Sequence, residues 1–428
     1  MKLSSPRGTS DIYGEDIDYR NSVIGTARRI FEIFNYKEII TPSFEYTQVF
    51  SRSIGEGTDI VQKEMYTFQD RKGRSLTLRP EGTASIVRSV VENKFYSGNM
   101  PLKLFYIGNM FRYERPQKGR MREFWQLGAE SIGSDDPVID AEVIWILSSL
   151  YKKLGFKKLV LVVNSIGCAK CRKKFLEEFK KSLKKSDLEK LCSDCRKRFV
   201  KNPLRIFDCK NSSCIKIISK APDIYSFLCS ECKKNFKEVL KCLKRFNIEY
   251  KTDPGLVRGF DYYTGTIFEI ISEDLESAQN ALGGGGRYDN LISQFGGPEI
   301  PAVGFAAGID RTIMLMKQLG IKVKKSAGRP KVYLIMMDES CREYSLDILK
   351  YLRELGVTSD INFNNRNIKT EIKWAEKSGY DFIIIIGEDE VKSRSLTVKD
   401  IRKFKQYKID WKTEREKVIE IIGAGNYG

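Results

Sequence analysis

Residues 103–130 combine charged side chains with the alternating apolar pattern of a β-hairpin. Two extended runs, 103–111 and 124–130, flank a loop rich in Arg and Lys. The polar side chains along and beside the two predicted strands are Arg112, Glu114, Gln126 and Glu130. Charged groups within a sheet are costly to bury unless a ligand, a partner or water pairs with them. The pattern therefore predicts a ligand-binding sheet with a cationic loop for a polyanion, and a Lys/Arg-rich turn on an edge hairpin is the plain structural alternative.

The chain contains no histidine, which limits the chemistry open to it. Neither a Ser/His nor a Cys/His nucleophile is available, and no metal can be held by imidazole. Any catalysis has to use carboxylates, arginines, lysines, tyrosines, cysteines or a bound metal.

Three stretches of the sequence resemble one enzyme family. Residues 111–130, FRYERPQKGRMREFWQLGAE, resemble motif 2 of class II aminoacyl-tRNA synthetases in the form found in histidyl-tRNA synthetases. Residues 256–269, LVRGFDYYTGTIFE, agree with the same family, and 283–311 contain a stretch that is similar to its motif 3, GFAAGIDR. The likeness extends from about residue 6 to the C-terminus. It implies a histidine–tRNA ligase, which activates L-histidine with ATP to histidyl-adenylate and transfers it to the 3′ end of tRNA(His).

The resemblance also implies roles for individual residues. Those expected to bind histidine are Glu81, Thr83, Gln126, Glu130, Arg258, Tyr262 and Tyr263. Those expected to bind ATP are Arg112, Glu114 and Arg311, and the catalytic charges are expected from Arg258, Arg112 and Arg311, with Mg²⁺ bridging phosphates. Arg115 and Gln117 are expected at the acceptor end of the tRNA. Without the resemblance, Glu81 reads equally well as a capping carboxylate in the first turn of a helix.

Four pairs of cysteines are concentrated in residues 168–252. They are Cys168 with Cys171, Cys192 with Cys195, Cys209 with Cys214, and Cys229 with Cys232. Such pairs fit zinc in two sites of four thiolates, or one such site with spare thiols. Disulfides are the rival interpretation, because some intracellular proteins of hyperthermophiles contain them. The sequence assigns no metal ligands.

The predicted fold class is α+β: a class II synthetase antiparallel sheet flanked by helices, a helical insertion and a C-terminal α/β domain. The expected domains are a catalytic domain (1–167 and 253–325), a Cys-rich insertion (168–252) and an anticodon-binding domain (326–428). Predicted elements include a helix at 16–34, which with the strand after it resembles the dimer-forming motif 1. A strand hairpin is expected at 256–271, with Gly265 near its turn. The C-terminal order of strands and helices predicts a small sheet of parallel strands.

Charge and composition limit the partners that the chain can have. Its formal net charge is +18, and the predicted insertion, with 24 basic and 10 acidic residues, supplies most of the excess. A concentrated positive field attracts phosphate backbones. No apolar run is long enough for a membrane span, so a cytoplasmic protein is expected. The family resemblance implies that it is a homodimer and binds tRNA(His). The alternatives are a synthetase-like regulatory subunit of ATP-phosphoribosyltransferase, which generally lacks the C-terminal module, and a generic nucleic-acid-binding protein.

Overall fold

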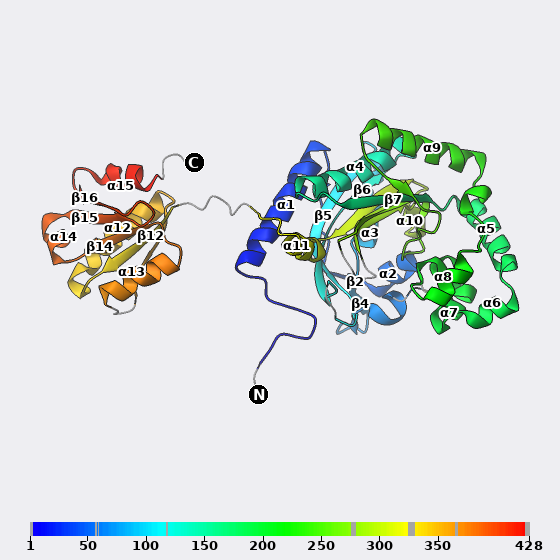
Figure 1. The fold of residues 1–428 in the computed structure, drawn as a ribbon, viewed down its shortest axis with the longest axis horizontal. Helices are drawn as coiled ribbons and strands as arrows, with labels where there is room; N and C mark the ends of the chain where they lie inside the picture. The colour runs from blue at the N-terminus through cyan, green and yellow to red at the C-terminus, as the bar shows by residue number, and fades with distance from the viewer. Residues whose placement is uncertain are drawn as a thin grey trace. The chain divides into compact units, whose positions relative to one another are not determined.

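The chain forms two compact units in the computed structural model, Met1–Val323 and Lys324–Gly428 (Figure 1). The structure describes residues 3–55, 58, 60–116, 119–274, 280–323, 330–363 and 367–423. Within these ranges, no helix has the length and apolar character needed to cross a membrane. The finer division predicted from the sequence, with an insertion at 168–252, stays a prediction.

An eight-stranded sheet forms the centre of the first unit. Its strand order is β1-β5-β6-β11-β10-β9-β7-β8, and all neighbours are antiparallel except β1 with β5 and β7 with β8. The predicted first hairpin is the β5–β6 pair, which confirms the antiparallel sheet expected from the sequence. The strands are β1 (Lys37–Glu38), β5 (Leu102–Phe111), β6 (Glu123–Ile132), β7 (Leu159–Ser165), β8 (Lys251–Thr252), β9 (Thr264–Ser272), β10 (Ala281–Arg287) and β11 (Ala302–Gly308).

Alternation along β6 divides its side chains between the two faces of the sheet. Successive side chains on a strand point to opposite faces. Leu127 and Ala129 pack into the larger hydrophobic core with helices α1, α4, α9 and α11. Gln126 and Glu130 consequently point to the other face, where the candidate site lies. The helices of the larger core are α1 (Glu15–Ile33), α4 (Pro137–Lys153), α9 (Ser230–Arg245) and α11 (Ile309–Gln318).

Local sequence signals account for the start and end of α4. Asp136 caps the helix by accepting a hydrogen bond from the Val138 amide at 2.9 Å, and Pro137 occupies the first turn. Two lysines in the last turn complement the helix dipole. Arg287 on β10 then reaches the buried carboxylate of Asp140 on α4, at 2.6 Å from Nη2 to Oδ2. This pair joins the helix layer to the strand that precedes Tyr288.

A smaller sheet and several short helices border the opposite face. The small sheet has the order β2-β4-β3, and α3 packs its buried Ile86, Val87 and Val90 against side chains of β5. These elements are β2 (Phe44–Tyr46), α2 (Thr47–Ile54), η1 (Ile60–Glu64), β3 (Thr67–Gln69), β4 (Ser75–Leu78), α3 (Thr83–Glu92), η2 (Phe95–Ser97) and α10 (Leu291–Gln294). Helix α3 ends at Glu92, and the single turn η2 follows it.

Residues 168–252 are mainly helical, as predicted. The elements are α5 (Ala169–Ser182), α6 (Lys185–Lys190), α7 (Ser193–Lys201), η3 (Pro203–Asp208), α8 (Ser212–Ile218), η4 (Ile224–Phe227) and α9. Helix α9 lies along α4, as Figure 1 shows, with the rings of Phe246 and Trp145 stacked at 4.7 Å. The shorter helices pack around aromatic side chains, including Phe175 and Phe179.

The predicted hairpin at 256–271 is wrong. Only its second half is a strand, β9, and residues 256–263 form turns and irregular backbone. The aromatic rings of this segment pack on one another, with Tyr262 and Tyr263 at 4.7 Å and Phe260 and Tyr262 at 5.2 Å. Side chains from 168–252, rather than a neighbouring strand, bind the main chain here: Arg205 donates to the Gly259 carbonyl and Arg172 to the Tyr263 carbonyl.

The second unit is an α/β module. Strands β13, β12 and β14 are parallel, as predicted, and β15 and β16 add two antiparallel strands that were not predicted. Its elements are β12 (Lys331–Met336), η5 (Glu339–Cys341), α12 (Arg342–Glu354), β13 (Thr358–Ile361), α13 (Ile368–Lys377), β14 (Phe382–Ile386), α14 (Glu388–Ser393), β15 (Ser395–Asp400), β16 (Lys405–Asp410) and α15 (Arg415–Ile422).

Candidate active site

A large cavity lies on the face of the sheet to which Gln126 points. Its volume is about 1270 Å³, which exceeds the ~300–1,000 Å³ typical of a site for one small molecule. It is lined by residues from the β5–β6 hairpin, from the start of α3, from 257–263, from β9 to β11, from α11 and from 168–252. The cavity is therefore large enough for two ligands side by side.

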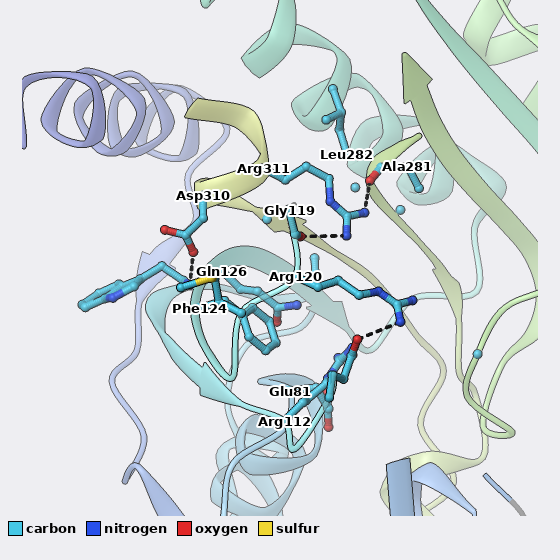
Figure 2. Close-up of a pocket in the computed structure, with 18 of the residues that line it drawn as sticks. Glu81, Arg112, Gly119, Arg120, Phe124, Gln126, Ala281, Leu282, Asp310 and Arg311 are labelled. Carbon is cyan, nitrogen blue, oxygen red and sulfur yellow. Dashed lines mark hydrogen bonds and ion pairs between the residues drawn. The ribbon is translucent and has the colours of Figure 1, made fainter. Parts of the chain in front are cut away.

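Within the described part of the chain, seven arginines line this one cavity, and they include the three expected to supply the catalytic charges, Arg112, Arg258 and Arg311, which come from distant parts of the sequence. Arg112 donates from Nε to the Pro80 carbonyl at 2.9 Å and lies over the Phe124 ring, at 5.3 Å from its centroid. Figure 2 shows Arg112 and Arg311 with Arg120 between them in this view. Planar guanidinium groups suit the binding of phosphate or carboxylate oxygens in pairs.

Arg311 lies in the first turn of α11 and is held by main-chain carbonyls. It donates to Ala281 at 2.6 Å and to Gly119 at 3.2 Å (Figure 2). Burial lowers the pKa of Arg311, and the neighbouring charge of Arg120 lowers it further. Arg120 in turn forms an ion pair with Glu114, at 2.8 Å. Glu114 thus forms ion pairs with two cationic side chains of the hairpin, Arg112 and Arg120.

Arg258 is paired with Glu269, a carboxylate on β9. Its Nε is buried without a hydrogen-bond partner among the described residues. A β-carbon on Gly284 would lie 2.9 Å from Nη1 of Arg258, so glycine at this position leaves room for the guanidinium. A buried donor without a partner is costly, which favours a ligand oxygen at this point of the cavity.

Glu81 and Thr83 lie at the start of α3. The Glu81 carboxylate accepts hydrogen bonds from the amides of Thr83 at 2.7 Å and Ala84 at 2.8 Å, as a capping carboxylate does. Glu81 also lines the cavity. Burial raises its pKa, against the lowering effect of the two amides. One carboxylate therefore caps the helix and faces the cavity.

Glu130 is completely buried on β6 beneath these residues. Its Oε1 accepts a hydrogen bond from the Thr83 hydroxyl at 2.7 Å, and its Oε2 accepts one from the Tyr288 hydroxyl at 2.6 Å. Burial is the main cause that raises the pKa of Glu130 to about 8, and the nearby charge of Glu81 adds to it. Glu130 can therefore hold or release a proton near neutral pH, which is suited to a ring with two nitrogens of different protonation.

Glu130 itself does not line the cavity, but the remaining residues expected to bind histidine do. Gln126 lines the cavity and its Oε1 is buried without a hydrogen-bond partner among the described residues. Tyr262 and Tyr263 also line it, and the Arg258 guanidinium lies 6.0 Å from the centre of the Tyr263 ring. The unsatisfied amide oxygen of Gln126 offers an acceptor to a ligand.

Of the two residues expected to contact tRNA, the structure places one outside the cavity. Arg115 is exposed and does not line the cavity, and Gln117 lies outside the described residues.

Sequence reasoning missed Tyr288, which contacts Glu130, and Glu269, which contacts Arg258. Glu269 carried a signal, as a lone carboxylate in the apolar run Ile267–Ile271 of β9. Tyr288 carried little signal, because the run of glycines before it predicts a role for the main chain rather than for a side chain.

The cysteines in residues 168–252 form two groups of four in space. One comprises Cys168, Cys171, Cys229 and Cys232, and the other comprises Cys192, Cys195, Cys209 and Cys214. Within each group, all four sulfur atoms lie within 4.8 Å of one another, close enough to hold a metal ion. None of the ten cysteines, all of which are described, forms a disulfide.

Comparison with known proteins gives matches along both units. The family model described as histidyl-tRNA synthetase matches residues 8–312, and that described as anticodon binding domain matches 331–421. The histidine–tRNA ligase of Halothermothrix orenii is 48% identical over 409 residues, which are 96% of this chain and 97% of that protein. That of Pelotomaculum thermopropionicum is 44% identical over 401 residues, 94% of each chain.

A solved structure extends the match to three dimensions. Apo histidyl-tRNA synthetase from S. aureus has a TM-score of 0.81 and 35% sequence identity, and the match covers 98% of this chain and 100% of that one. Three findings agree on the family. The family model matches more than half of the chain, the sequence identity extends over nearly its whole length, and the fold is shared. The chain belongs to the histidyl-tRNA synthetase family of class II aminoacyl-tRNA synthetases.

Proposed function

We propose that this protein is a histidine–tRNA ligase. In the first step, a carboxylate oxygen of histidine attacks the α-phosphorus of ATP, and the bond to pyrophosphate breaks to give histidyl-adenylate. In the second, a terminal ribose hydroxyl of tRNA(His) attacks the carbonyl carbon and AMP leaves. Both steps need positioning and charge neutralisation more than covalent help from the protein. The observation that carries the proposal is the presence of three guanidinium groups in one cavity beside the buried pair Glu81 and Glu130.

The end of the cavity near Glu130 would hold histidine. Glu81 suits the α-ammonium group, with Thr83 and Gln126 as further polar partners. Glu130 and Tyr263 would contact the two nitrogens of the imidazole, and Tyr262 would pack beside it. Arg258 would contact both the histidine carboxylate and the α-phosphate. A site that pairs both ring nitrogens rejects an analogue lacking either one, because a buried polar group is then left unpaired.

The other end would hold ATP with Mg²⁺. Arg112 and Arg311 would bind the phosphates as bidentate cations. Glu114 would orient Arg112 and Arg120 through its ion pairs with them. Glu114 and Glu269 line the cavity and are hard oxygen donors of the kind that Mg²⁺ accepts. Mg²⁺, when bound, neutralises charge on the phosphates.

Three parts of the chain would contact tRNA(His). The hairpin tip with Arg115 and Gln117 would meet the acceptor end, and residues 168–252, with their excess of positive charge, would lie over the acceptor arm. The second unit would read the anticodon, in keeping with its family match at 331–421. A tRNA ligase acts where translation takes place, so we place the protein in the cytoplasm. It would act as a homodimer through α1 and the strand that follows it.

The regulatory-subunit alternative is less well supported. Such a subunit generally lacks the C-terminal module, and this chain has one. It would also bind histidine without consuming ATP.

The experiment that tests the proposal is ATP–pyrophosphate exchange by the purified full chain, with each amino acid added singly. Exchange that depends on histidine alone, followed by histidine attachment to tRNA(His), is the expected result. Histidine binding without exchange would support the regulatory subunit, and nucleic-acid binding with neither histidine binding nor exchange would support a generic nucleic-acid-binding protein.

A further inference from the structure

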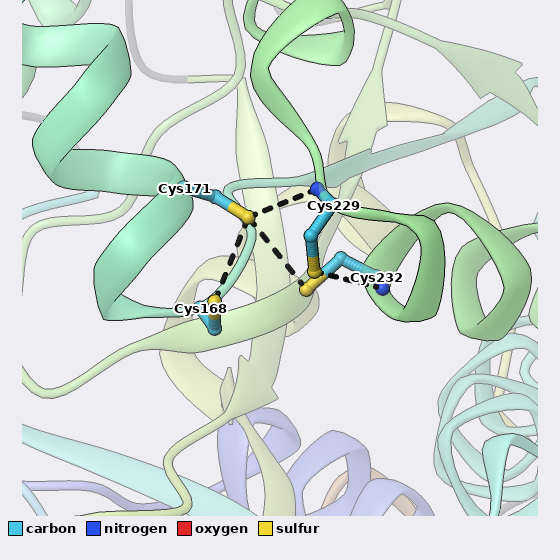
Figure 3. A group of neighbouring side chains, drawn as sticks. All are labelled: Cys168, Cys171, Cys229 and Cys232. Carbon is cyan, nitrogen blue, oxygen red and sulfur yellow. Dashed lines mark hydrogen bonds between the residues drawn. The ribbon is translucent and has the colours of Figure 1, made fainter.

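The two cysteine clusters bring together segments that are far apart in the sequence. The α5–α9 cluster joins Cys168 and Cys171 to Cys229 and Cys232, from the N-terminal ends of α5 and α9 (Figure 3). The α7–α8 cluster consists of the other four cysteines, at α7, after η3 and in α8. Each cluster therefore ties together the ends of elements from separate parts of residues 168–252.

The sulfur separations match those around a single tetrahedral metal ion. With zinc–sulfur bonds of about 2.3 Å, the edge of the tetrahedron is about 3.8 Å. The separations are 3.5 Å between Cys168 and Cys171, 4.0 Å between Cys171 and Cys232, and 3.9 Å between Cys192 and Cys209. A cluster of several irons and sulfides would push four thiolates farther apart than the 4.8 Å limit found in both groups.

Main-chain amides point at the sulfur atoms, as expected where thiolates carry negative charge. The Cys229 amide donates to Sγ of Cys171 at 3.2 Å, and the Cys192 amide donates to Sγ of Cys214 at 3.3 Å. Cys168, Cys192 and Cys229 are also the N-caps of α5, α7 and α9, where the helix dipole favours negative charge. Four thiolates around one divalent ion leave an excess of negative charge, which the basic residues of 168–252 compensate.

Hydrogen bonds link both clusters to the loop at 259–263. Arg172 follows Cys171 directly and donates to the Tyr263 carbonyl at 2.9 Å. Arg205, between Cys195 and Cys209, donates to the Gly259 carbonyl at 2.8 Å, and the Asn202 amide bonds the Asp261 carboxylate. This loop has irregular backbone and carries Tyr262 and Tyr263, so its conformation depends on these partners.

We propose that each cysteine cluster is a zinc site of four thiolates, and that the two zinc ions position the histidine-binding loop through Arg172 and Arg205. The zinc sites stand on the cluster geometry alone, whereas their effect on histidine binding rests on the proposed function. Short helices around a small core are often stable only when a metal fixes them. Arg172 is a positioning residue, since it does not line the main cavity.

Metal analysis of the full chain tests the sites. Protein purified without chelators is expected to contain two zinc ions per chain by plasma mass spectrometry. Cys171→Ser and Cys214→Ser should each lower the content to one, and Cys242→Ser and Cys341→Ser, outside the clusters, should leave two. A mercurial titration of the unaltered protein, which needs no variant to fold, should release two zinc ions. A metal-free folded chain with ten reactive thiols, or one with iron instead, would overturn the proposal.

Kinetics of pyrophosphate exchange test the link to the loop. Arg172→Ala is expected to raise the KM for histidine at least tenfold, with the KM for ATP and kcat within twofold and both zinc ions retained. Arg172→Lys should recover part of the loss, and Lys174→Ala, at an exposed position of the same helix, should have no effect. An unchanged KM in Arg172→Ala would refute the link. Absence of exchange in the unaltered protein would instead refute the proposed function and leave the zinc count as it is.

Discussion

The carboxylate of Glu130 occupies the space that a side chain at Gly304 would need. The strands pair so that Gly304 on β11 lies opposite Glu130 on β6, and a β-carbon on Gly304 would lie 1.6 Å from Oε2 of Glu130. Glu130 is held in this position by the hydroxyl groups of Thr83 and Tyr288. The glycine is thus a condition for the carboxylate to lie behind the cavity wall, where Thr83 and Tyr288, which do line the cavity, bind it.

Gly304→Ala should displace Glu130 and weaken histidine binding. We expect kcat/KM for histidine in pyrophosphate exchange to fall by about 100-fold or more, since a buried polar group is left unpaired, while the KM for ATP changes little. Gly25→Ala is the matched control, because a β-carbon there meets nothing within 4 Å and alanine favours the helix α1. Normal histidine kinetics in Gly304→Ala would show that Glu130 does not contact the substrate.

The pH dependence of histidine binding should change when Glu130 is replaced. Burial raises the pKa of Glu130 from 4.5 to about 8, so the carboxyl is mostly protonated at pH 7, and in the proposed complex it would share this proton with the imidazole. Above about pH 8 this proton is lost and affinity should fall; below about pH 6.5 the free imidazole is protonated and affinity should fall again. In calorimetric titrations, the affinity of Glu130→Gln should no longer fall above about pH 8, while its fall below about pH 6.5 should remain. The same fall above about pH 8 in the variant would contradict this assignment.

The same pKa shift has a consequence for stability. Between pH 4.5 and about 8 the native state holds a proton on Glu130 that the unfolded chain has lost. The unfolding free energy of the histidine-free protein should therefore contain a contribution from Glu130 that decreases as pH rises through this window and is constant above it. Denaturant unfolding of Glu130→Gln should lack this contribution, so the difference between the two proteins should change across the window; a constant difference would contradict the shift.

Asp140→Ala should destabilise the first unit strongly. Asp140 is fully buried and accepts hydrogen bonds from Nε and Nη2 of Arg287. Its removal leaves the buried guanidinium with the longer ion pair to Asp289, at 3.4 Å, in place of the short one. Such losses cost about 3–5 kcal/mol. The exposed pair of Glu238 with Lys241 on α9 is the control, where Glu238→Ala should change stability by at most about 1 kcal/mol. Thermal unfolding of the full chain measures both, and equal effects would contradict the structural role of Asp140.

The proposed homodimer predicts a change of mass when an apolar side chain near α1 is altered. Ile33 and Ile40 are 74% and 83% exposed, on either side of the edge strand β1. Light scattering should give twice the chain mass of 49.2 kDa, and Ile40→Asp should shift the equilibrium to the monomer. Phe404→Asp, at an exposed position of the second unit, should remain dimeric. A monomeric unaltered protein would refute the dimer.

Local patterns predicted much of the fold. Alternation predicted the β5–β6 hairpin, and other local patterns predicted α1 and the βαβαβ order of the second unit, because each of these patterns lies within a single element. The loop at 256–263 escaped prediction because its conformation depends on Arg172 and Arg205, which are distant in sequence. A run of aromatic residues looks the same whether its rings face a sheet or one another.

The candidate site was predictable residue by residue only through the family resemblance. The relation of Glu130 to Gly304 depends on strand pairing across 174 positions, and no local pattern encodes it. The cysteines illustrate the same limit: the sequence shows four pairs, but which pairs combine is decided by how α5 meets α9. Tertiary contacts, rather than composition, make these assignments.

The most direct measurement of the central claim is histidine-dependent pyrophosphate exchange by Arg258 variants. If Arg258 contacts both the histidine carboxylate and the α-phosphate, Arg258→Ala should lower kcat/KM by about 10²–10³-fold, with Arg258→Lys intermediate and Arg74→Ala, outside the cavity, unchanged. Circular dichroism should show that the Arg258 variants stay folded. Exchange at the normal rate by folded Arg258→Ala protein would contradict the assignment of this cavity as the site of histidine activation.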